Sequence, residues 1–340
     1  MSILVTGGCG YVGSHVCVKL LEHGFDVVVL DDFSNAQPDV PARIRDVAGR
    51  ALEVVRADVT DRPALTRALA GMRIDGVIHL AGRKSVAESV RLPLSYYETN
   101  VGGTINVREA AGDCAFVFSS SATVYGRPTS CPLSESATTH PVNPYGHSKL
   151  MAERVLLDAA AAGCTSPTVL LRSFNPVGAH PSGLLGDDPR GEPNNLMPRI
   201  ERVAVGLDAE LTVHGDDYPT RDGTAVRDYV HVDDIAAAHV AALRYRGPRP
   251  VVANLGSASG FTVTEVVAAF ERATGKRVPV RYGPRREGDV PELWADATRA
   301  RDLLGWSATR TLEDACVDAL RWRRSKYAPS ALSSATARKA

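Results

Sequence analysis

Short, continuously apolar runs alternate with longer segments of mixed polarity through the first half of the chain. The runs are partly β-branched and lie at residues 3–5, 27–30, 52–55, 77–80, 116–118 and 169–171. Such runs are typical of strands that are buried on both faces of a parallel sheet. The segments between them are long enough for crossover helices, which we expect at residues 11–23, 64–70, 94–111 and 145–162. The pattern predicts an α/β fold with a Rossmann-type, doubly wound parallel sheet.

The character of the sequence changes after residue 172. Residues 175–193 are rich in proline and glycine, and helical patterns then recur at residues 196–206, 233–244, 263–274 and 312–325. We expect one domain over residues 1–172 and a smaller C-terminal α/β region over residues 173–327, with some exchange of chain between the two. Residues 328–340 are rich in alanine and serine and are expected to form a flexible tail.

Composition and charge exclude several classes of function. The chain carries 39 Lys+Arg and 39 Asp+Glu, and this zero net charge argues against a partner that is nucleic acid or a membrane surface. It has no run of about 18 apolar residues, and its first residues lack the features of a signal peptide. The six cysteines are scattered without CxxC spacing, which favours reduced thiols in a soluble, cytoplasmic enzyme.

A glycine-rich turn follows the first predicted strand and opens the first predicted helix. Gly7, Gly10 and Gly13 form a GxxGxxG pattern, and Gly8, Gly10 and Gly13 form GxGxxG. Glycines at this place let backbone N–H groups approach a pyrophosphate at the helix N-terminus. Asp31 ends the second predicted strand, where a carboxylate would bind ribose hydroxyls and repel a 2′-phosphate. The alternative is a purely structural turn, but the context favours a site for NAD rather than NADP.

Tyr145 and Lys149 stand four residues apart at the head of a predicted helix, so their side chains share one helix face. An ammonium near a phenol favours the phenolate, lowering a pKa that is ordinarily about 10 and creating a general base. Such a pair is common by chance. The serines at 119–121 strengthen the interpretation, because they follow a predicted strand at the edge where doubly wound sheets bind ligands.

At this point the sequence resembles the extended short-chain dehydrogenase/reductase family, and within it the UDP-glucose (UDP-galactose) 4-epimerases. The likeness spans roughly residues 2–325. Beyond the glycine turn and the Tyr/Lys pair, it rests on motifs at residues 11–15, 81–86, 119–126, 173–180, 193–198, 226–229 and 284–289. The last four lie in the part of the chain that faces the substrate in that family, so they concern the nucleotide sugar as well as NAD.

The resemblance implies an NAD-dependent isomerase that epimerises C4 of UDP-glucose and UDP-galactose. The reaction would pass through a 4-keto sugar, with transient hydride transfer to tightly bound NAD. Tyr145 and Ser121 would handle the sugar's 4-hydroxyl, and Lys149 would hold the nicotinamide ribose and tune the tyrosine. A homodimer through the helices at residues 94–111 and 145–162 is also implied.

The resemblance assigns two sets of binding positions. Those that match the family's NAD contacts are Gly7, Gly10, Tyr11, Val12, Gly13, Asp31, Asn35, Asp58, Val59, Ala81, Lys84, Asn100, Tyr145, Lys149 and Phe174. Those that match its contacts with the sugar, uracil and diphosphate are Ser121, Tyr145, Asn175, Asn195, Leu196, Val213, Gly215, Arg227, Arg286, Asp289 and Leu293. Arginine suits a diphosphate, because its guanidinium binds phosphate oxygens in a two-pronged fashion.

Two residues depart from the family pattern. Ser173 replaces a common tyrosine, and Leu293 stands where a residue's size controls access for the sugar's 2-substituent. Leucine is intermediate there, so the alternative is a UDP-N-acetylhexosamine 4-epimerase or another nucleotide-sugar-modifying enzyme of the same family.

Two other functions are disfavoured, and no metal site is expected. A 4,6-dehydratase is disfavoured because Ala122 and Thr123 stand where those enzymes place carboxylic acids, and an NAD-sensing regulator is disfavoured because the Tyr/Lys pair is present. The nine histidines show no HExxH or paired ligand spacing, and we expect no metal site.

Overall fold

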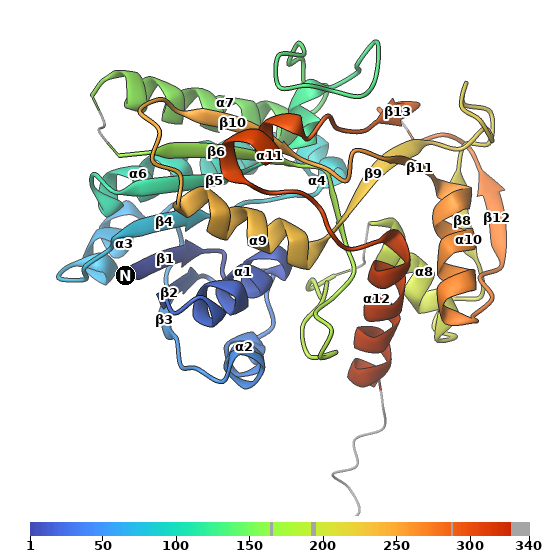
Figure 1. Ribbon diagram of the computed structural model, residues 1–340, viewed down its shortest axis with the longest axis horizontal. Helices are drawn as coiled ribbons and strands as arrows, with labels where there is room; N and C mark the ends of the chain where they lie inside the picture. The colour runs from blue at the N-terminus through green and yellow to red at the C-terminus, as the bar shows by residue number, and fades with distance from the viewer. Residues whose placement is uncertain (164–165, 192–194, 287, 328–340) are drawn as a thin grey trace, which may run out of the picture.

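The central feature of the computed structural model is a seven-stranded parallel sheet (Figure 1). The structure describes residues 1–163, 166–191, 195–286 and 288–327, so the predicted tail at 328–340 lies outside the described residues. The strand order is β10-β6-β5-β4-β1-β2-β3. The strands are β1 (Ser2–Thr6), β2 (Asp26–Asp31), β3 (Glu53–Arg56), β4 (Gly76–His79), β5 (Ala115–Ser121), β6 (Thr168–Ser173) and β10 (Val251–Leu255). The predicted doubly wound fold class is confirmed, because the order reverses direction at β1.

Helices cover both faces of this sheet. One buried cluster joins α1 (Tyr11–Glu22) and α9 (Val232–Leu243) to side chains of β1, β2, β6 and β10. The opposite cluster joins α3 (Arg62–Leu69), α6 (Gly103–Ala111) and α7 (Pro144–Ala161) to the alternate side chains of the same strands. Because successive residues of a strand point to opposite faces, a strand between two helix layers must be apolar throughout. This explains the continuous apolar runs in the sequence.

The remaining helices of the first half are short. They are α2 (Val40–Ala48), α4 (Val86–Arg91), α5 (Pro93–Tyr97), the π turn η1 (Glu98–Gly102) and the 3₁₀ turn η2 (Ala122–Tyr125). The single helix expected at residues 94–111 is therefore divided into α5, η1 and α6. A π turn is often found at a functional site, and this one contains the buried Asn100. No helix among the described residues is long and apolar enough to cross a membrane.

The second half builds a smaller layer beside the first sheet (Figure 1). It contains β7 (Asn175–Val177), β9 (Val226–His231), β11 (Gly260–Thr262) and β13 (Glu292–Leu293) in one sheet, and β8 (Leu211–His214) with β12 (Val280–Gly283) in another. Helices α8 (Leu196–Ala204), α10 (Val263–Thr274) and α12 (Leu312–Tyr327) share its apolar core, and α11 (Thr298–Leu304) packs near β10. The boundary at residue 172 is a prediction, and the chain returns to the first sheet through α9 and β10.

Candidate active site

The predicted site residues of the first half gather at the carboxyl ends of the parallel strands. β1 leads into the glycine turn, β2 ends at Asp31, β5 ends at Ser121 and β6 ends at Ser173. Ligands of doubly wound sheets bind at this edge, near the point where the strand order reverses. The sheet therefore brings together residues that are more than a hundred positions apart in the sequence.

The glycine turn has a conformation that side chains would not permit. Gly7 has a φ of 68°, in the left-handed region that favours glycine. A Cβ on Gly13 would lie 2.1 Å from the carbonyl oxygen of Gly7, so helix α1 can approach the turn only because residue 13 has no side chain. Helix α1 has no side-chain cap and no acidic residue in its first turn. No carboxylate of the helix's own first turn therefore competes with an anion that approaches its N-terminal dipole.

Asp31 is tied to this turn by its own hydrogen bonds. Its buried carboxylate accepts from the backbone N–H of Cys9 at 2.9 Å and from that of Phe33 at 2.9 Å. Burial raises the pKa of Asp31, while these two N–H donors oppose the rise. The aspartate thus fixes the turn against the end of β2, in addition to the ribose contact predicted for it.

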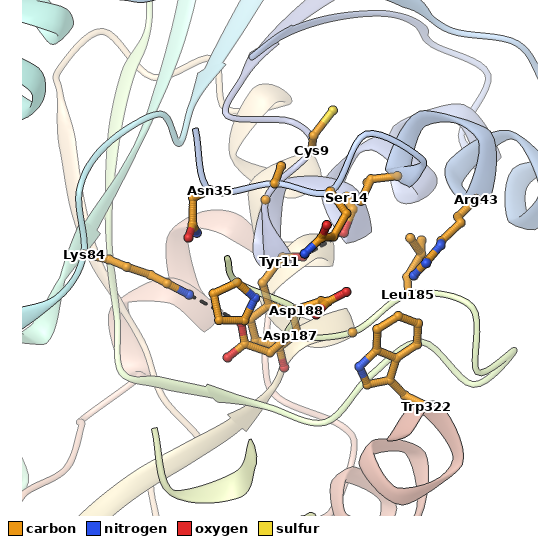
Figure 2. Close-up of a pocket in the computed structure, with 16 residues that line it drawn as sticks. Cys9, Tyr11, Ser14, Asn35, Arg43, Lys84, Leu185, Asp187, Asp188 and Trp322 are labelled. Carbon is orange, nitrogen blue, oxygen red and sulfur yellow. Dashed lines mark hydrogen bonds and ion pairs between the residues drawn. The ribbon is translucent and has the colours of Figure 1, made fainter. Parts of the chain in front are cut away.

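A pocket lies beside the glycine turn and is closed by a segment from the second half of the chain (Figure 2). Lys84 forms an ion pair with Asp187 at 3.5 Å and lies over the ring of Tyr11. Arg43 stacks on Trp322 at 5.2 Å. The lining residues are Cys9, Gly10, Tyr11, Ser14, Asn35, Ala36, Gln37, Val40, Arg43, Lys84, Leu185, Gly186, Asp187, Asp188, Pro189 and Trp322. No motif in the sequence links these distant positions, so Arg43, residues 185–189 and Trp322 were not predicted.

Asn100 organises the loop after β4. Its side-chain amide donates to the carbonyl of Arg83 at 3.1 Å and to Ser148 Oγ at 2.9 Å, and its oxygen accepts from the N–H of Arg83 at 2.8 Å. The loop at residues 81–84 is thereby tied to helix α7, one residue before Lys149. Asn100 therefore positions Ala81 and Lys84 relative to the Tyr/Lys pair.

Ser121, Tyr145 and Lys149 lie where β5 ends against helix α7. The Ser121 hydroxyl accepts from the N–H and the hydroxyl of Thr123 at 3.3 and 3.0 Å, and it acts to lower the pKa of Tyr145. The Lys149 ammonium donates to the carbonyl oxygen of Ser119 at 2.8 Å and lies over the ring of Phe118 at 4.7 Å. Asn143 caps the helix by accepting from the N–H of Gly146 at 2.9 Å, which fixes where the turn that carries Tyr145 begins.

The charge states of the pair differ from the sequence prediction. Burial raises the pKa of Tyr145, and the hydrogen bond with Ser121 only partly offsets this. The sequence predicted a lowered pKa for this phenol, whereas in this structure its pKa is raised, because desolvation of the phenolate outweighs the favourable contribution. Burial also lowers the pKa of Lys149 to about 8, while the charge of Glu153 opposes that shift.

The other predicted cofactor positions have different surroundings. Val12 follows Tyr11 in the first turn of α1, and Asn35 lines the pocket. Asp58 accepts from the N–H of Thr60 at 2.8 Å, and the buried Val59 packs on α6, so neither lines this pocket. Phe174 is buried, and its ring packs against Tyr125 behind the site.

The predicted substrate residues of the second half fall on several elements. Arg227 on β9 forms an ion pair with Asp289, and Leu293 pairs with Arg227 across β9 and β13. Asn175 donates to the carbonyl of Asp228 at 2.9 Å. Asn195 is exposed and donates a hydrogen bond to Asp187 at 3.5 Å, and Leu196 is the first residue of α8. Val213 lies in the apolar core, and Gly215 has a φ of 84°. The side chain of Val213 is thus used for packing.

Positive charge is concentrated near Arg286. Burial and the charge of Arg199 lower the pKa of Arg286, and burial together with the charges of both arginines lowers the pKa of His214, while Asp289 opposes both shifts. Cations that repel one another at close range favour an anion between them. The sequence analysis did not identify Arg199.

Ser173 has an unusual surrounding for a polar side chain. Its Oγ is buried and has no hydrogen-bond partner among the described residues. The residue pairs with Ser121 across β5 and β6. Buried hydroxyls are normally hydrogen-bonded, so this orphaned atom beside Ser121 is available to a ligand.

Comparison with known proteins places this geometry in a family. The family model described as the NAD dependent epimerase/dehydratase family matches residues 3–256. The chain belongs to this family. A UDP-glucose 4-epimerase of Bacillus subtilis is 48% identical over 330 residues, which cover 96% of this chain and 97% of the relative. The family predicted from the sequence is confirmed.

Two solved structures support the same relation. A UDP-glucose 4-epimerase from Stenotrophomonas maltophila, with bound NAD and formylated UDP-arabinopyranose, has a TM-score of 0.93 at 47% identity and covers 96% of this chain and 98% of its own. Another from Bifidobacterium longum, in complex with NAD+ and UDP, has a TM-score of 0.92 at 43% identity and covers 96% and 99%. The described residues fit such a cofactor, since the turn leaves no room for side chains at Gly13 and an unpartnered hydroxyl stands at Ser173.

Proposed function

We propose that this protein is an NAD-dependent UDP-glucose 4-epimerase, which interconverts UDP-glucose and UDP-galactose through a 4-keto sugar. The observation that carries the proposal is the meeting of Ser121, Tyr145 and Lys149 at the sheet edge that also presents the glycine turn. The near full-length similarity to proteins of that name supports it.

Two groups of residues would hold the cofactor. The glycine turn and the N-terminus of α1 suit the pyrophosphate, and Asp31 suits the adenosine ribose. Lys149 would hold the nicotinamide ribose, Lys84 lines the pocket beside the glycine turn, and Asn100 fixes the loop that carries Lys84. The chemistry that NAD supplies when bound is reversible acceptance of the hydride from C4 of the sugar.

The proton chemistry belongs to the chain's own side chains. Tyr145 takes the proton from the sugar's 4-hydroxyl and returns one in the second half of the cycle. Ser121, which acts to lower the pKa of the phenol, holds that hydroxyl and favours the phenolate. The ammonium of Lys149, one helical turn away, adds a positive charge that the phenolate needs in a buried site.

The diphosphate is the natural tether for the substrate. Arg227 and Arg286, with Arg199 close to Arg286, supply positive charge for it. Holding the nucleotide while leaving the hexose free lets the sugar turn and present its other face, as inversion at C4 requires. Leu293 lies next to Arg227 and packs near Phe174, so it would border the sugar's 2-substituent.

The protein's state in the cell is also part of the proposal. The described cysteines Cys9, Cys17, Cys114, Cys131 and Cys316 are free thiols, which suits the cytoplasm.

Apolar side chains on α4, α5 and α7 are exposed, with Leu94 81% exposed, and we assign this face to a homodimer. Sedimentation should show a dimer for the wild type and a monomer for Leu94→Glu; a wild-type monomer would contradict the assignment.

The test of the activity uses purified protein without added cofactor. UDP-galactose should be converted to UDP-glucose, because NAD is regenerated in each cycle and stays bound. Tyr145→Phe should keep the fold and the bound NAD but lose at least ~10²-fold in turnover, the low end for a general base. Wild-type protein that binds NAD and leaves UDP-galactose unchanged would overturn the proposal.

A further inference from the structure

A buried ion pair stands directly behind the proposed proton-transfer residues. Glu153 lies one helical turn after Lys149 on α7 and is 1% exposed. Arg172 on β6 donates to it twice, from Nε to Oε1 at 2.9 Å and from Nη2 to Oε2 at 2.7 Å. A two-pronged pair of this kind fixes the plane of the carboxylate as well as its position.

The same carboxylate holds the strand that carries the site. Ser120 Oγ donates to Glu153 Oε1 at 2.5 Å. Ser120 stands between Ser119, whose carbonyl accepts from Lys149, and Ser121, whose hydroxyl acts to lower the pKa of Tyr145. The Glu153 carboxylate thus holds Ser120. The residues on either side of Ser120 face Lys149 and Tyr145.

Arg172 extends this network away from the site. Its guanidinium lies over the ring of Tyr125 at 4.9 Å, and the Tyr125 hydroxyl donates to Asn254 on β10 at 2.7 Å. Neither Arg172 nor Glu153 lines the pocket beside the glycine turn. A buried ion pair costs desolvation energy and is by itself weak evidence for stability, so its place behind the site calls for a functional explanation.

The charges around Lys149 can be assigned from the elements packed against it. The ionisable groups there are His79 on β4, Tyr96 on α5, Tyr125 on η2, Tyr145 and Glu153 on α7, and Arg172 on β6. Burial lowers the pKa of His79 to about 3 and raises those of Tyr96 and Tyr125, so these three groups are neutral near pH 7, while Tyr145 is the proposed base. Of this set, Glu153 supplies the negative charge that stabilises the lysine's ammonium.

We propose that Glu153, oriented by Arg172, is a positioning residue for the epimerase reaction. It keeps a negative charge beside Lys149 and holds residues 119–121 so that Lys149 and Ser121 both reach Tyr145. This inference rests on the proposed function, but its test concerns the pH dependence of turnover and not the identity of the substrate.

The experiment compares variants that break the same ion pair from opposite sides. In Glu153→Gln the negative charge is lost, so Lys149 gives up its proton more easily. The alkaline limb of the profile of kcat against pH should move to lower pH by roughly one unit. We expect kcat to fall by about 10- to 100-fold, with KM for UDP-galactose nearly unchanged. In Arg172→Met the negative charge stays, and the alkaline limb should not move to lower pH.

Two further variants keep the test decisive. Glu153→Asp should restore much of the lost kcat and the wild-type limb. The double variant Glu153→Gln/Arg172→Met replaces the pair by neutral groups and can be measured in place of a single variant that fails to fold. Its alkaline limb should move to lower pH by the same amount as that of Glu153→Gln. If all variants lower the melting temperature but leave the alkaline limb in place, the pair is structural only and the inference is wrong. Lack of wild-type epimerase activity would instead contradict the proposed function.

Discussion

Replacing Gly13 by alanine tests whether the glycine turn is shaped for a cofactor. The change adds a single methyl group at a helical position where alanine is intrinsically favoured by about 1 kcal/mol. The added Cβ would lie 2.1 Å from the Gly7 carbonyl oxygen and 2.8 Å from Gly8 Cα. Real structures do not tolerate such contacts, so helix α1 must move away from the turn.

The expected loss follows from the cost of overpacking. A crowded contact costs about 1–3 kcal/mol, and if the strain is relieved only by opening the turn, NAD should bind roughly 5- to 150-fold more weakly. Titration of NAD into cofactor-free protein measures the affinity, and the NAD released on denaturation measures how much stays bound. Gly102→Ala is the matched control, because a Cβ there meets no atom within 4 Å. An affinity within about twofold of wild type for Gly13→Ala would refute the reasoning.

The other predictions concern acid–base chemistry, cofactor choice and sugar size. Ser121→Ala removes a hydroxyl that acts to lower the pKa of Tyr145, so the acid limb of the profile of kcat against pH should move to higher pH; an unmoved limb would disprove the role of Ser121. Denatured wild-type protein should release NAD(H) and little NADP(H), and mostly NADP(H) would contradict the argument from Asp31. UDP-N-acetylgalactosamine should be turned over more slowly than UDP-galactose, by ~5- to 150-fold for an overpacked contact. Leu293→Tyr should abolish that second activity and Leu293→Ser should raise it, and an unchanged ratio of the two activities would show that residue 293 is not the gate.

Much of the first sheet could be predicted because each of its strands is buried on both faces. The strands from β1 to β6 lie within a few residues of the apolar runs. β10 was not predicted, although its sequence, Val251–Leu255, is similar. It pairs with β6, some eighty residues earlier in the chain. A local sequence pattern does not indicate which distant strand a segment will pair with.

The site was predictable where a motif has a local physical reason. The glycine turn and the Tyr/Lys spacing are of this kind. The closing segment at residues 185–189, the stack of Arg43 on Trp322 and the Glu153–Arg172 pair join positions with no fixed spacing, so only the fold shows them. The error over the pKa of Tyr145 has the same origin, because a sequence shows which charges are near in the chain but not how deeply a phenol is buried.

The central claim is that the hydride taken from C4 returns to the same carbon within one protein molecule. The direct measurement starts from UDP-galactose that carries deuterium at C4, incubated in ordinary water without added NAD. We predict UDP-glucose in which the deuterium is retained at C4, since the hydride does not exchange with solvent. Product in which the deuterium at C4 has been replaced by solvent hydrogen would contradict the account, as would deuterium at any other carbon of the sugar.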